Sequence, residues 1–339
     1  MNTSLHTTEF PTTGARGLIC EIQNGFLEEA LPPMYSIISI IGFFSNALAL
    51  WVFHFGTQRL NSITVYMKSL AISDLLLAFC LLFRAAYQNQ SGPQIICKLV
   101  GIIFYLTMYV SIFLLSLICL DRYLKIIRPL QQFRIHTVPN STAAVWAVWL
   151  ICAGSMLLFF AEDDTKKPCS HRCFHFKKRN ALGAGLNMAA VATFFFLLGF
   201  FLYSYSKIAF KLRMVSLKKT HQGSKTTNSK AIMKTFVVLA TFLICFAPYH
   251  VVRVPYILAQ VEVISSPCVK QALHVANELV LCISALNCCF DPVIFYFLSS
   301  SFKRALLAAI HGKLRKALQK NQGDFSHRKS ITESRMQGS

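Results

Sequence analysis

Apolar residues gather in seven long stretches along the chain, which short polar segments separate. The stretches cover about residues 31–55, 63–87, 97–123, 143–161, 183–206, 232–260 and 273–299. Each has the roughly 20 mostly apolar residues that a helix needs to cross the hydrocarbon core of a bilayer. The pattern predicts an all-α membrane protein, with a seven-transmembrane helix bundle over residues 31–300 after an amino-terminal segment over residues 1–30.

A different pattern follows the seventh stretch. Between residues 301 and 320, apolar side chains recur every four positions with cations between them, at Phe302, Leu306, Ile310, Leu314 and Leu318. This spacing predicts a cytoplasmic amphipathic helix on the membrane surface, in contact with membrane lipids. A solvated basic tail is the alternative. Residues 321–339 are expected to form a disordered cytoplasmic tail.

Composition and charge agree with a membrane protein. The chain is 54% hydrophobic and 14% charged, against about 25% charged residues in soluble domains, and its mean hydropathy is +0.49. The net charge of +20 lies in short loops and the tail, which argues against a nucleic-acid partner. Because Lys and Arg concentrate in residues 207–234 and after residue 303, we expect these segments in the cytoplasm. The loop 162–181 carries six Lys and Arg residues and conflicts with this rule, which points to a functional role.

Polar groups inside the apolar spans are costly and usually functional. Asp74 and Asp291 lie mid-span in the second and seventh stretches, with Asn46, Ser111 and Asn287 at similar depth. Two carboxylates in hydrocarbon require a cation, a proton or hydrogen-bond partners. The pattern favours a bound allosteric sodium ion, and a purely structural polar cluster is the alternative. No other cofactor or metal is expected.

The third and sixth spans carry further signals. Asp121-Arg122-Tyr123 closes the third span, and Cys97 precedes Arg122 by 25 residues, or roughly 37 Å of helix. We expect Asp121 to pair with Arg122. Pro248 lies within the sixth span, where it removes a backbone hydrogen bond and kinks the helix.

Several motifs follow one another in a fixed order. They are Asn46, Leu70-Ala71-Ile72-Ser73-Asp74-Leu75, Asp121-Arg122-Tyr123, Trp149, Phe246-Ala247-Pro248 and Asp291-Pro292. Together they resemble the signature of rhodopsin-like G-protein-coupled receptors, over residues 31–318. The resemblance implies a multi-pass plasma-membrane receptor that is not an enzyme, with an extracellular amino terminus. Its implied partners are a heterotrimeric G protein, of the inhibitory class, and arrestin.

The resemblance also implies roles for individual residues. The G-protein coupling residues would be Asp121, Arg122, Tyr123 and Tyr205, and the activation switch would comprise Phe242, Phe246, Pro248, Asp291, Pro292 and Phe295. Phe295 stands where such receptors usually have tyrosine, so a water-mediated coupling to Tyr205 is left open. Kinase-dependent arrestin recruitment would use the tail hydroxyls, and an unmodified tail is the alternative. These hydroxyls are Ser326, Ser330, Thr332 and Ser334.

The implied disulfides follow the same resemblance. It pairs Cys97 with Cys173 and Cys20 with Cys268, and leaves Cys169 as a competitor for Cys173. Asn2 and Asn89 head triplets for glycosylation.

Within the family, two sets of residues narrow the resemblance. Pro248-Tyr249-His250 followed by Arg253 resembles the purinergic nucleotide receptors and their orphan and lysophosphatidylserine-receptor relatives. The stretches Phe83-Arg84, Cys173-Phe174-His175 and Asn277-Glu278 lean toward the lysophosphatidylserine side. An anionic lysophospholipid is therefore the favoured ligand, with a nucleotide or nucleotide-sugar as the alternative.

Fixed charges predict where this small anionic ligand binds. Arginine forks suit phosphate and carboxylate groups, and tyrosines can line a base or an acyl chain. The candidate residues are Arg84, Tyr105, Tyr109, Lys177, Arg179, His250, Arg253, Asn277 and Glu278. In the alternative interpretation, Glu278 neutralises Arg253 within the bundle. A membrane transporter, from a different class, would show an inverted internal repeat and broken helices, and neither is visible in the sequence.

Overall fold

The computed structural model describes residues 25–55, 61–88, 90–131, 133–160, 173–218 and 225–308. The predictions for residues 1–24, for the tail beyond residue 308, and for Asn89 and Cys169 lie outside these ranges. The glycosylation sites Asn2 and Asn89, the tail hydroxyls and most of the amphipathic helix therefore stay predictions.

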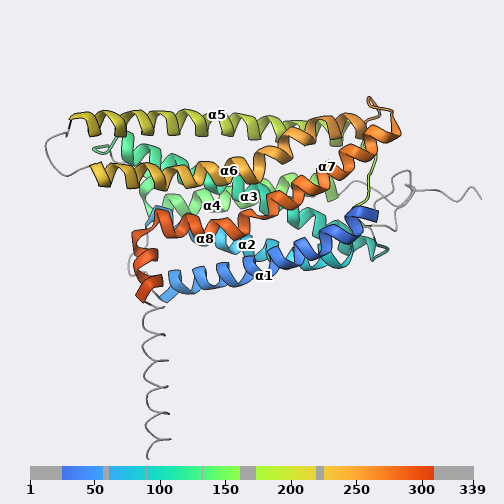
Figure 1. Ribbon diagram of the computed structural model, residues 1–339, viewed down its shortest axis with the longest axis horizontal. Coiled ribbons are helices and arrows are strands. Elements are labelled where there is room, and N and C mark those ends of the chain that lie inside the picture. The colour runs from blue at the N-terminus through green and yellow to red at the C-terminus, as the bar shows by residue number, and fades with distance from the viewer. Residues whose placement is uncertain are drawn as a thin grey trace, which may run out of the picture.

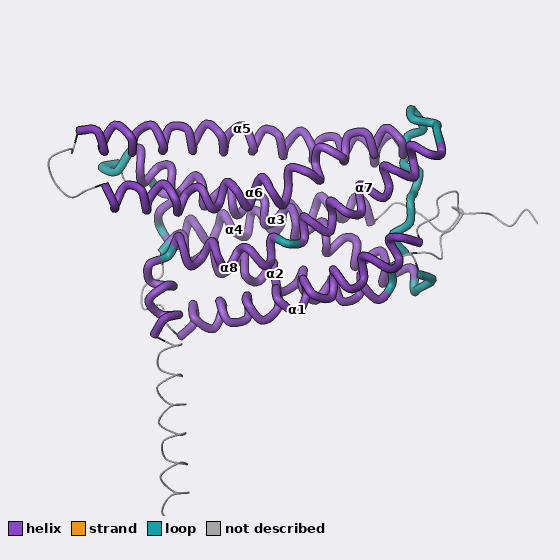
Figure 2. The backbone as a smooth tube through the Cα atoms, in the orientation of Figure 1, coloured by secondary structure: helices purple, strands orange, loops and turns teal. Residues whose placement is uncertain are grey.

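Long helices that run side by side make up the bundle (Figures 1 and 2). They are α1 (Gly25–Phe55), α2 (Ser62–Ala86), α3 (Gln94–Ile127), α4 (Val138–Phe160), α5 (Ala181–Lys218), α6 (Lys225–Gln260), α7 (Pro267–Ala285) and α8 (Asn287–Leu298), with a short 3-10 helix η1 (Arg134–His136). Seven spans of the described chain are long and apolar enough to cross a membrane, with α7 and α8 forming one of them. The predicted all-α fold is confirmed.

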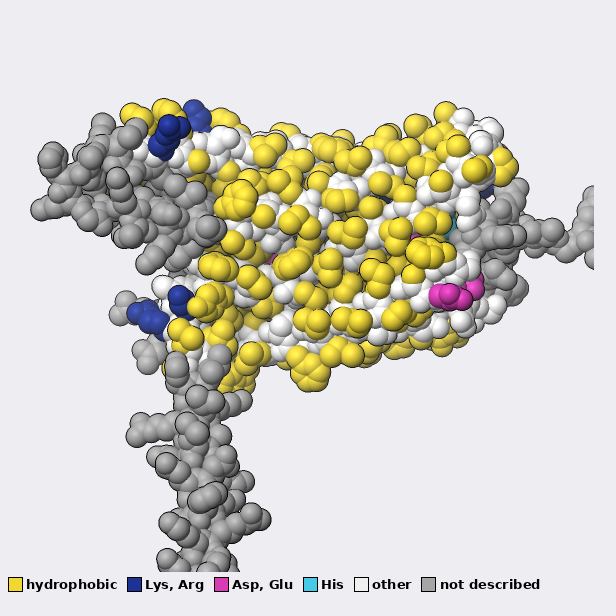
Figure 3. Space-filling view, viewed as in Figure 1, with side chains coloured by type: hydrophobic (Ala, Val, Ile, Leu, Met, Phe, Trp, Pro, Cys, Tyr) yellow, Lys and Arg dark blue, Asp and Glu magenta, His cyan; other side chains and the backbone are white. Residues whose placement is uncertain are grey.

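The two ends of the bundle differ in what they carry. Cys97, in the first turn of α3, forms a disulfide with Cys173, and we call this end the disulfide end. Asp121, Arg122 and Tyr123 lie near the other end of α3, which we call the Asp-Arg-Tyr end. Helices α2 and α6 finish at the disulfide end, and α7 begins there. Figure 3 shows that apolar side chains cover the middle of the face in view, as a lipid-facing surface requires.

Several helix boundaries follow from local chemistry. Asn61 caps α2, because its Oδ1 accepts hydrogen bonds from Thr64 N at 3.0 Å and from Thr64 Oγ1 at 2.9 Å. Pro267 opens α7, where a missing N–H costs nothing. Helices α5 and α6 extend well beyond the predicted boundaries at residues 206 and 232. Their extra turns are polar, so hydropathy could not reveal them.

The seventh span was predicted as one helix, but it breaks at Leu286 between α7 and α8. Pro292 lies inside α8 and has no N–H to donate to the carbonyl four residues earlier, that of Cys288. Asn46 on α1 supplies the missing donor, with its Nδ2 2.7 Å from Cys288 O. The bond also joins α1 to α8.

Helix α6 contains two prolines, Pro248 and Pro255, yet it remains one continuous helix. Figure 1 shows that α6 changes direction along its length, in line with the predicted kink. At the end of α8 the chain turns, and residues 300–308 are again helical. Phe302 is buried there against Phe53 and Phe295, with ring centroids 4.8 and 6.0 Å away.

Candidate functional site

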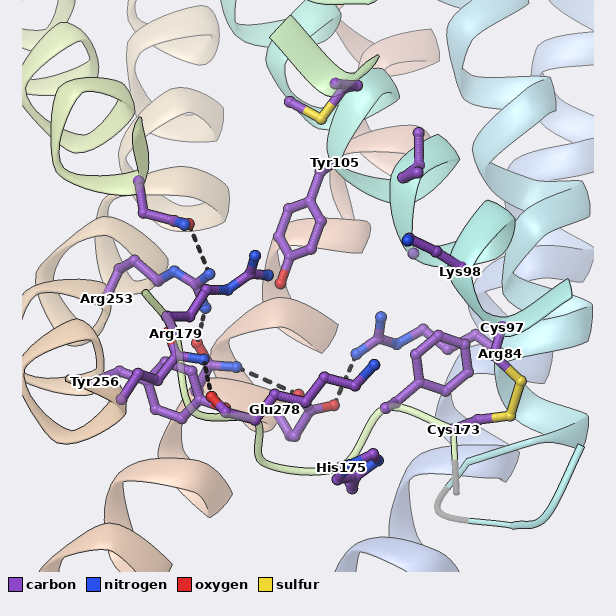
Figure 4. A pocket seen from close by; sticks show the side chains of 18 of the residues that line it. Arg84, Cys97, Lys98, Tyr105, Cys173, His175, Arg179, Arg253, Tyr256 and Glu278 are labelled. Carbon is purple, nitrogen blue, oxygen red and sulfur yellow. Dashed lines mark hydrogen bonds and ion pairs between the residues drawn. A yellow bond between two sulfur atoms is a disulfide. The ribbon is translucent and has the colours of Figure 1, made fainter. Parts of the chain in front are cut away.

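A pocket opens at the disulfide end of the bundle (Figure 4). Helices α2 to α7 and the segment 173–180 before α5 all contribute to it. The lining includes the predicted residues Arg84, Tyr105, Tyr109, Lys177, Arg179, Arg253, Asn277 and Glu278. The structure thus brings together eight of the nine residues proposed from sequence.

The segment 173–180 is fastened at both of its ends. Cys173 is bonded to Cys97 on α3, with 5.5 Å between the two Cα atoms, which confirms this predicted disulfide. At the other end, Arg179 N donates to Gln260 O at 3.1 Å, and Gln260 Nε2 donates to Lys177 O at 2.9 Å. Cys268 forms no disulfide with any described residue, and its proposed partner Cys20 lies outside them.

Arg84 is almost fully buried in α2 and pairs with Glu278 on α7. Its Nη2 lies 2.7 Å from Glu278 Oε2, and its guanidinium packs against the rings of Phe104 and Phe174 at 4.8 and 4.6 Å. The sequence-based alternative gave Glu278 to Arg253, and that alternative is wrong. A buried carboxylate needs one close cation, and the geometry makes that cation Arg84.

Arg253 on α6 is equally buried, but neutral groups surround it. Its Nη1 donates to Asn277 Oδ1 at 3.2 Å and its Nη2 donates to Asn187 Oδ1 at 2.8 Å. The rings of Tyr105, Tyr249 and Tyr256 lie 5.2–5.8 Å from its Cζ. Hydrogen bonds and ring faces therefore orient the guanidinium, but no carboxylate of the described chain is bonded to it.

The pocket lining is strongly cationic. Six of its side chains carry positive charge, namely Arg84, Lys98, Lys177, Lys178, Arg179 and Arg253, whereas Glu278 is the one carboxylate among the described lining residues. Figure 4 shows Glu278 between Arg84 on one side and Arg253 on the other. Arg84 and Arg253 are the buried cations among these six, and Glu278 pairs with Arg84. A buried charge without a counter-ion is unfavourable, so Arg253 suits a ligand that brings negative charge.

His250 was predicted to face the cavity and does not. It is fully buried below the pocket, with Nδ1 2.8 Å from Phe246 O, and its ring stacks on Phe194 at 3.8 Å between centroids. Phe194 in turn stacks on Phe242 at 5.3 Å. The ring of His250 therefore extends the aromatic cluster around the predicted switch residue Phe242. One turn of helix separates His250 from Arg253, but the rotation about α6 differs enough to bury the imidazole.

Several lining residues were missed by sequence reasoning. They are Lys98, Asn187, Tyr256 and Gln260. Lys98 follows the disulfide cysteine, and Tyr256 lies three residues after Arg253, so helical spacing could have indicated both. Asn187 is an isolated polar residue in the apolar fifth span, and that signal could have identified it.

The predicted sodium-site residues form a second buried cluster, in mid-bundle. Asn287 Nδ2 donates to Asp74 Oδ1 at 3.3 Å. Several buried oxygen atoms have no hydrogen-bond partner among the described residues: Asn46 Oδ1, Asp74 Oδ2, both carboxylate oxygens of Asp291, Ser111 Oγ and Asn287 Oδ1. Oxygen atoms of this kind fit a hard cation. The Nδ2 of Asn46 is bonded to Gly42 O and Cys288 O.

At the Asp-Arg-Tyr end, Asp121 has partners other than the predicted one. Its oxygens accept from Ser62 Oγ at 2.8 Å and from Lys125 Nζ at 2.8 Å, and His136 Nδ1 lies 2.9 Å away. No ion pair joins Asp121 to Arg122 in the described structure, because Lys125 and His136 already occupy the carboxylate. The Nε of Arg122 is buried without a described partner. Asp121 therefore ties α2, α3 and η1 together.

The remaining predicted residues Tyr205, Phe295 and Tyr123 each lie against another aromatic ring. Tyr205 and Phe201 on α5 pack near the Asp-Arg-Tyr end, with ring centroids 5.9 Å apart. Phe295 on α8 lies against Phe53 at 5.5 Å. Tyr123 faces Tyr203 at 6.3 Å.

Comparison with known proteins agrees with this geometry. The family described as 7 transmembrane receptor (rhodopsin family) matches residues 45–295. The probable G-protein coupled receptor 34 of Pan troglodytes is 35% identical over 323 residues, covering 93% of this chain and 82% of that protein.

Two further relatives carry the name of a ligand in their own names. The lysophosphatidic acid receptor 6 of Gallus gallus is 29% identical, and the match covers 83% of this chain and 94% of that protein. The platelet-activating factor receptor of Rattus norvegicus is 28% identical, and the match covers 84% of this chain and 86% of that protein. The family consists of receptors and not of enzymes or transporters. This chain belongs to the rhodopsin family of seven-transmembrane, G-protein-coupled receptors.

Proposed function

We propose that this receptor binds an anionic lysophospholipid, with lysophosphatidylserine favoured, and activates a heterotrimeric G protein of the inhibitory class. The disulfide end would then face the extracellular side together with the amino terminus. The observation that carries the proposal is the state of Arg253, which is buried, is oriented by two neutral amides and has no carboxylate of the described residues bonded to it.

The phosphate of such a ligand would bind Arg253. Its guanidinium fork can hold two phosphate oxygens at once, and Lys177 and Arg179 line the same pocket. The Arg84–Glu278 pair supplies a cation and an anion side by side. A serine head group, with a carboxylate and an ammonium, matches that pair in charge.

A nucleotide or nucleotide-sugar is the second candidate. The rings of Tyr105 and Tyr256 in the pocket wall favour it, because a base can stack on them. One relative is by name a receptor for lysophosphatidic acid, and this supports the lysophospholipid instead.

Signal transfer would run from the pocket to the Asp-Arg-Tyr end. The aromatic cluster around Phe242 lies between the two. We assign the sodium ion to the oxygens of Asp74, Ser111, Asn287 and Asp291, and its bound charge would stabilise the two carboxylates in the inactive state. Asn46 would add its Oδ1 to this set, since that oxygen is also buried without a described partner, while its Nδ2 keeps the contact to α8. Arg122 would meet the G protein, and arrestin would bind the tail.

The experiment compares three ligands on cells that express the receptor at matched surface levels: 1-oleoyl-lysophosphatidylserine, 1-oleoyl-lysophosphatidic acid and UDP. Inhibition of cyclic-AMP formation is measured. The Arg253→Ala variant should lose roughly ten- to a hundredfold in potency, since a charge-assisted hydrogen bond contributes about 1.5–3 kcal/mol.

The matched control is Arg253→Lys, which keeps the positive charge but loses the guanidinium fork. Its agonist potency should lie between those of the wild type and Arg253→Ala. Unchanged potency of the active lysophospholipid on both Arg253→Ala and Arg84→Ala would place the head group elsewhere. A response to UDP alone would favour the nucleotide class.

A further inference from the structure

An unbroken chain of hydrogen bonds crosses the pocket from α5 to α2. Asn187 Oδ1 accepts from Arg253 Nη2 at 2.8 Å, and Arg253 Nη1 donates to Asn277 Oδ1 at 3.2 Å. Asn277 Nδ2 donates to Glu278 Oε1 at 3.3 Å, and Glu278 Oε2 accepts from Arg84 Nη2 at 2.7 Å. The two arginines of the pocket are therefore ends of one connected network.

The direction of each amide in this chain is fixed. Asn187 Nδ2 donates to Gly183 O at 2.7 Å, so its oxygen must face Arg253. Asn277 uses its nitrogen for Glu278, so its oxygen also faces Arg253. Either amide, if turned over, would place an NH₂ group against a guanidinium N–H, donor against donor. Because Arg253, Asn277, Glu278 and Arg84 are all at most 4% exposed, each bond strengthens its neighbours in a medium of low dielectric constant.

The neutral charge of Asn187 and Asn277 is as important as their geometry. An amide oxygen orients Arg253 and leaves its positive charge for a ligand. An aspartate at position 277 would accept the same hydrogen bond but would neutralise the guanidinium and repel Glu278. A ligand anion would then have to displace a carboxylate.

We propose that Asn187 and Asn277 are positioning residues that couple Arg253 to Arg84, so that an anionic group bound at one arginine changes the affinity at the other. The coupling rests on the proposed function, in which both arginines meet the ligand. An anion that takes Arg253 Nη1 removes the donor of Asn277. The amide is then free to turn, which releases Glu278 Oε1 and changes the pairing of Arg84. A head group with two separated charged groups gains binding affinity from both arginines, whereas a single phosphate gains it directly from one.

The first test is a double-mutant cycle on the potency of 1-oleoyl-lysophosphatidylserine, with Arg84→Ala, Arg253→Ala and the double variant at matched surface levels. Coupled residues show non-additive effects, so the double variant should lose at least about fivefold less than the product of the single losses. In an Asn277→Leu background, the potency loss of the double variant should equal the product of the two single losses to within about twofold. Losses that multiply already in the wild-type background, or a coupling that Asn277→Leu leaves undiminished, would overturn the proposal.

The second test needs no ligand and so separates this proposal from the proposed function. Asn187→Leu keeps the branched shape of the side chain but removes the acceptor for Arg253. In the purified receptor it should lower the thermal unfolding midpoint by roughly 2 °C, and in the Arg253→Ala background its effect should vanish. The control is Gln94→Leu, which changes an amide in the pocket lining but outside the hydrogen-bonded network. It should shift the unfolding midpoint equally in both backgrounds. An equal shift for Asn187→Leu in both backgrounds would mean that Asn187 only packs.

The two tests together identify which idea fails. Suppose that Arg84→Ala and Arg253→Ala leave potency unchanged, while the effect of Asn187→Leu on the unfolding midpoint depends on Arg253. The hydrogen-bonded network is then supported and the ligand assignment is wrong. If both alanine variants lose potency but the losses multiply, the ligand site stands and the coupling is wrong.

Discussion

The imidazole of His250 lies flat on the ring of Phe194, with 3.8 Å between the ring centroids and 7° between the planes. Tyr109, which lines the pocket, meets the same imidazole edge-on at 5.9 Å. Phe194 continues to Phe242 at 5.3 Å, and Phe242 to Phe201 at 4.1 Å. One aromatic column thus connects the pocket wall to the middle of the bundle, through a residue that sequence reasoning had assigned to the ligand.

This column predicts how His250 variants behave. His250→Phe keeps a flat ring on Phe194 and should leave agonist potency within about threefold of wild type. His250→Ala removes the ring from the column and should reduce the maximal response more than the affinity. Radioligand binding together with cyclic-AMP dose–response curves separates the two quantities. If His250→Phe and His250→Ala lose affinity equally, the imidazole binds the ligand after all.

The Asp121 cluster predicts a second effect. Arg122→Ala should abolish G-protein activation at normal surface expression, because it removes the guanidinium proposed to meet the G protein. His136→Ala frees one side of the Asp121 carboxylate and loosens η1 from α3, so it should change basal signalling without affecting ligand affinity. Nucleotide exchange on purified G protein measures both. Normal exchange with the Arg122→Ala receptor would refute the coupling role.

The mid-bundle carboxylates predict sensitivity to sodium. Replacing NaCl with choline chloride at equal ionic strength should raise agonist affinity, since the ion is proposed to hold the inactive state. Asp74→Asn should abolish this difference, and Ser111→Ala should reduce it. Ser116→Ala, a buried hydroxyl on the same helix that bonds to Ile112 O at 2.8 Å, is the matched control. A sodium effect that survives Asp74→Asn would leave the cluster as a structural one.

Glu262, in the turn between α6 and α7, predicts a dependence on pH and salt. Lys178 and Lys270 lie 2.7 and 3.1 Å from its Oε1 and, by hydrogen bonding, lower the pKa of its carboxyl below the ordinary value of 4.5. A depressed pKa means that the contact is fully present at neutral pH and is lost only as acid protonates the carboxylate. Ligand dissociation should therefore be insensitive to pH between about 6 and 8.

Glu262→Gln should speed ligand dissociation, because the segment 173–180 loses a tie to the α6–α7 turn. High salt should do the same to the wild-type receptor but not to the variant, since salt screens an exposed ion pair. Glu28→Gln, an exposed carboxylate on α1 outside the pocket lining, is the control. Equal salt sensitivity in the wild type and in Glu262→Gln would exclude the ion pair as the cause.

The sequence predicts the fold well because a membrane span needs only length and apolar character, and both are local. It also places Arg84 and Arg253 in the site, because a charged residue inside a span has few other positions to occupy. It could not assign partners. Arg84 and Glu278 are 194 positions apart, and only the folded bundle shows that they meet.

Rotation about a helix axis explains the other errors. His250 and Arg253 are close in sequence, but one faces the aromatic column and the other faces the pocket. Asp121 is adjacent to Arg122, yet neighbouring residues on a helix point in different directions. Its carboxylate therefore finds Lys125 one turn later and His136 on η1.

The extension of α6 beyond the apolar span makes it a long lever. From Pro248 back to Lys225 the helix runs for 23 residues, or roughly 35 Å at 1.5 Å per residue. A rotation of about 10° at the proline would carry the far end through about 6 Å by the same geometry. A small rotation at Pro248 would thus displace the far end of α6 by about the rise of one helix turn. We therefore expect the size of that displacement to depend on the length of the polar extension of α6, which lies far from the pocket.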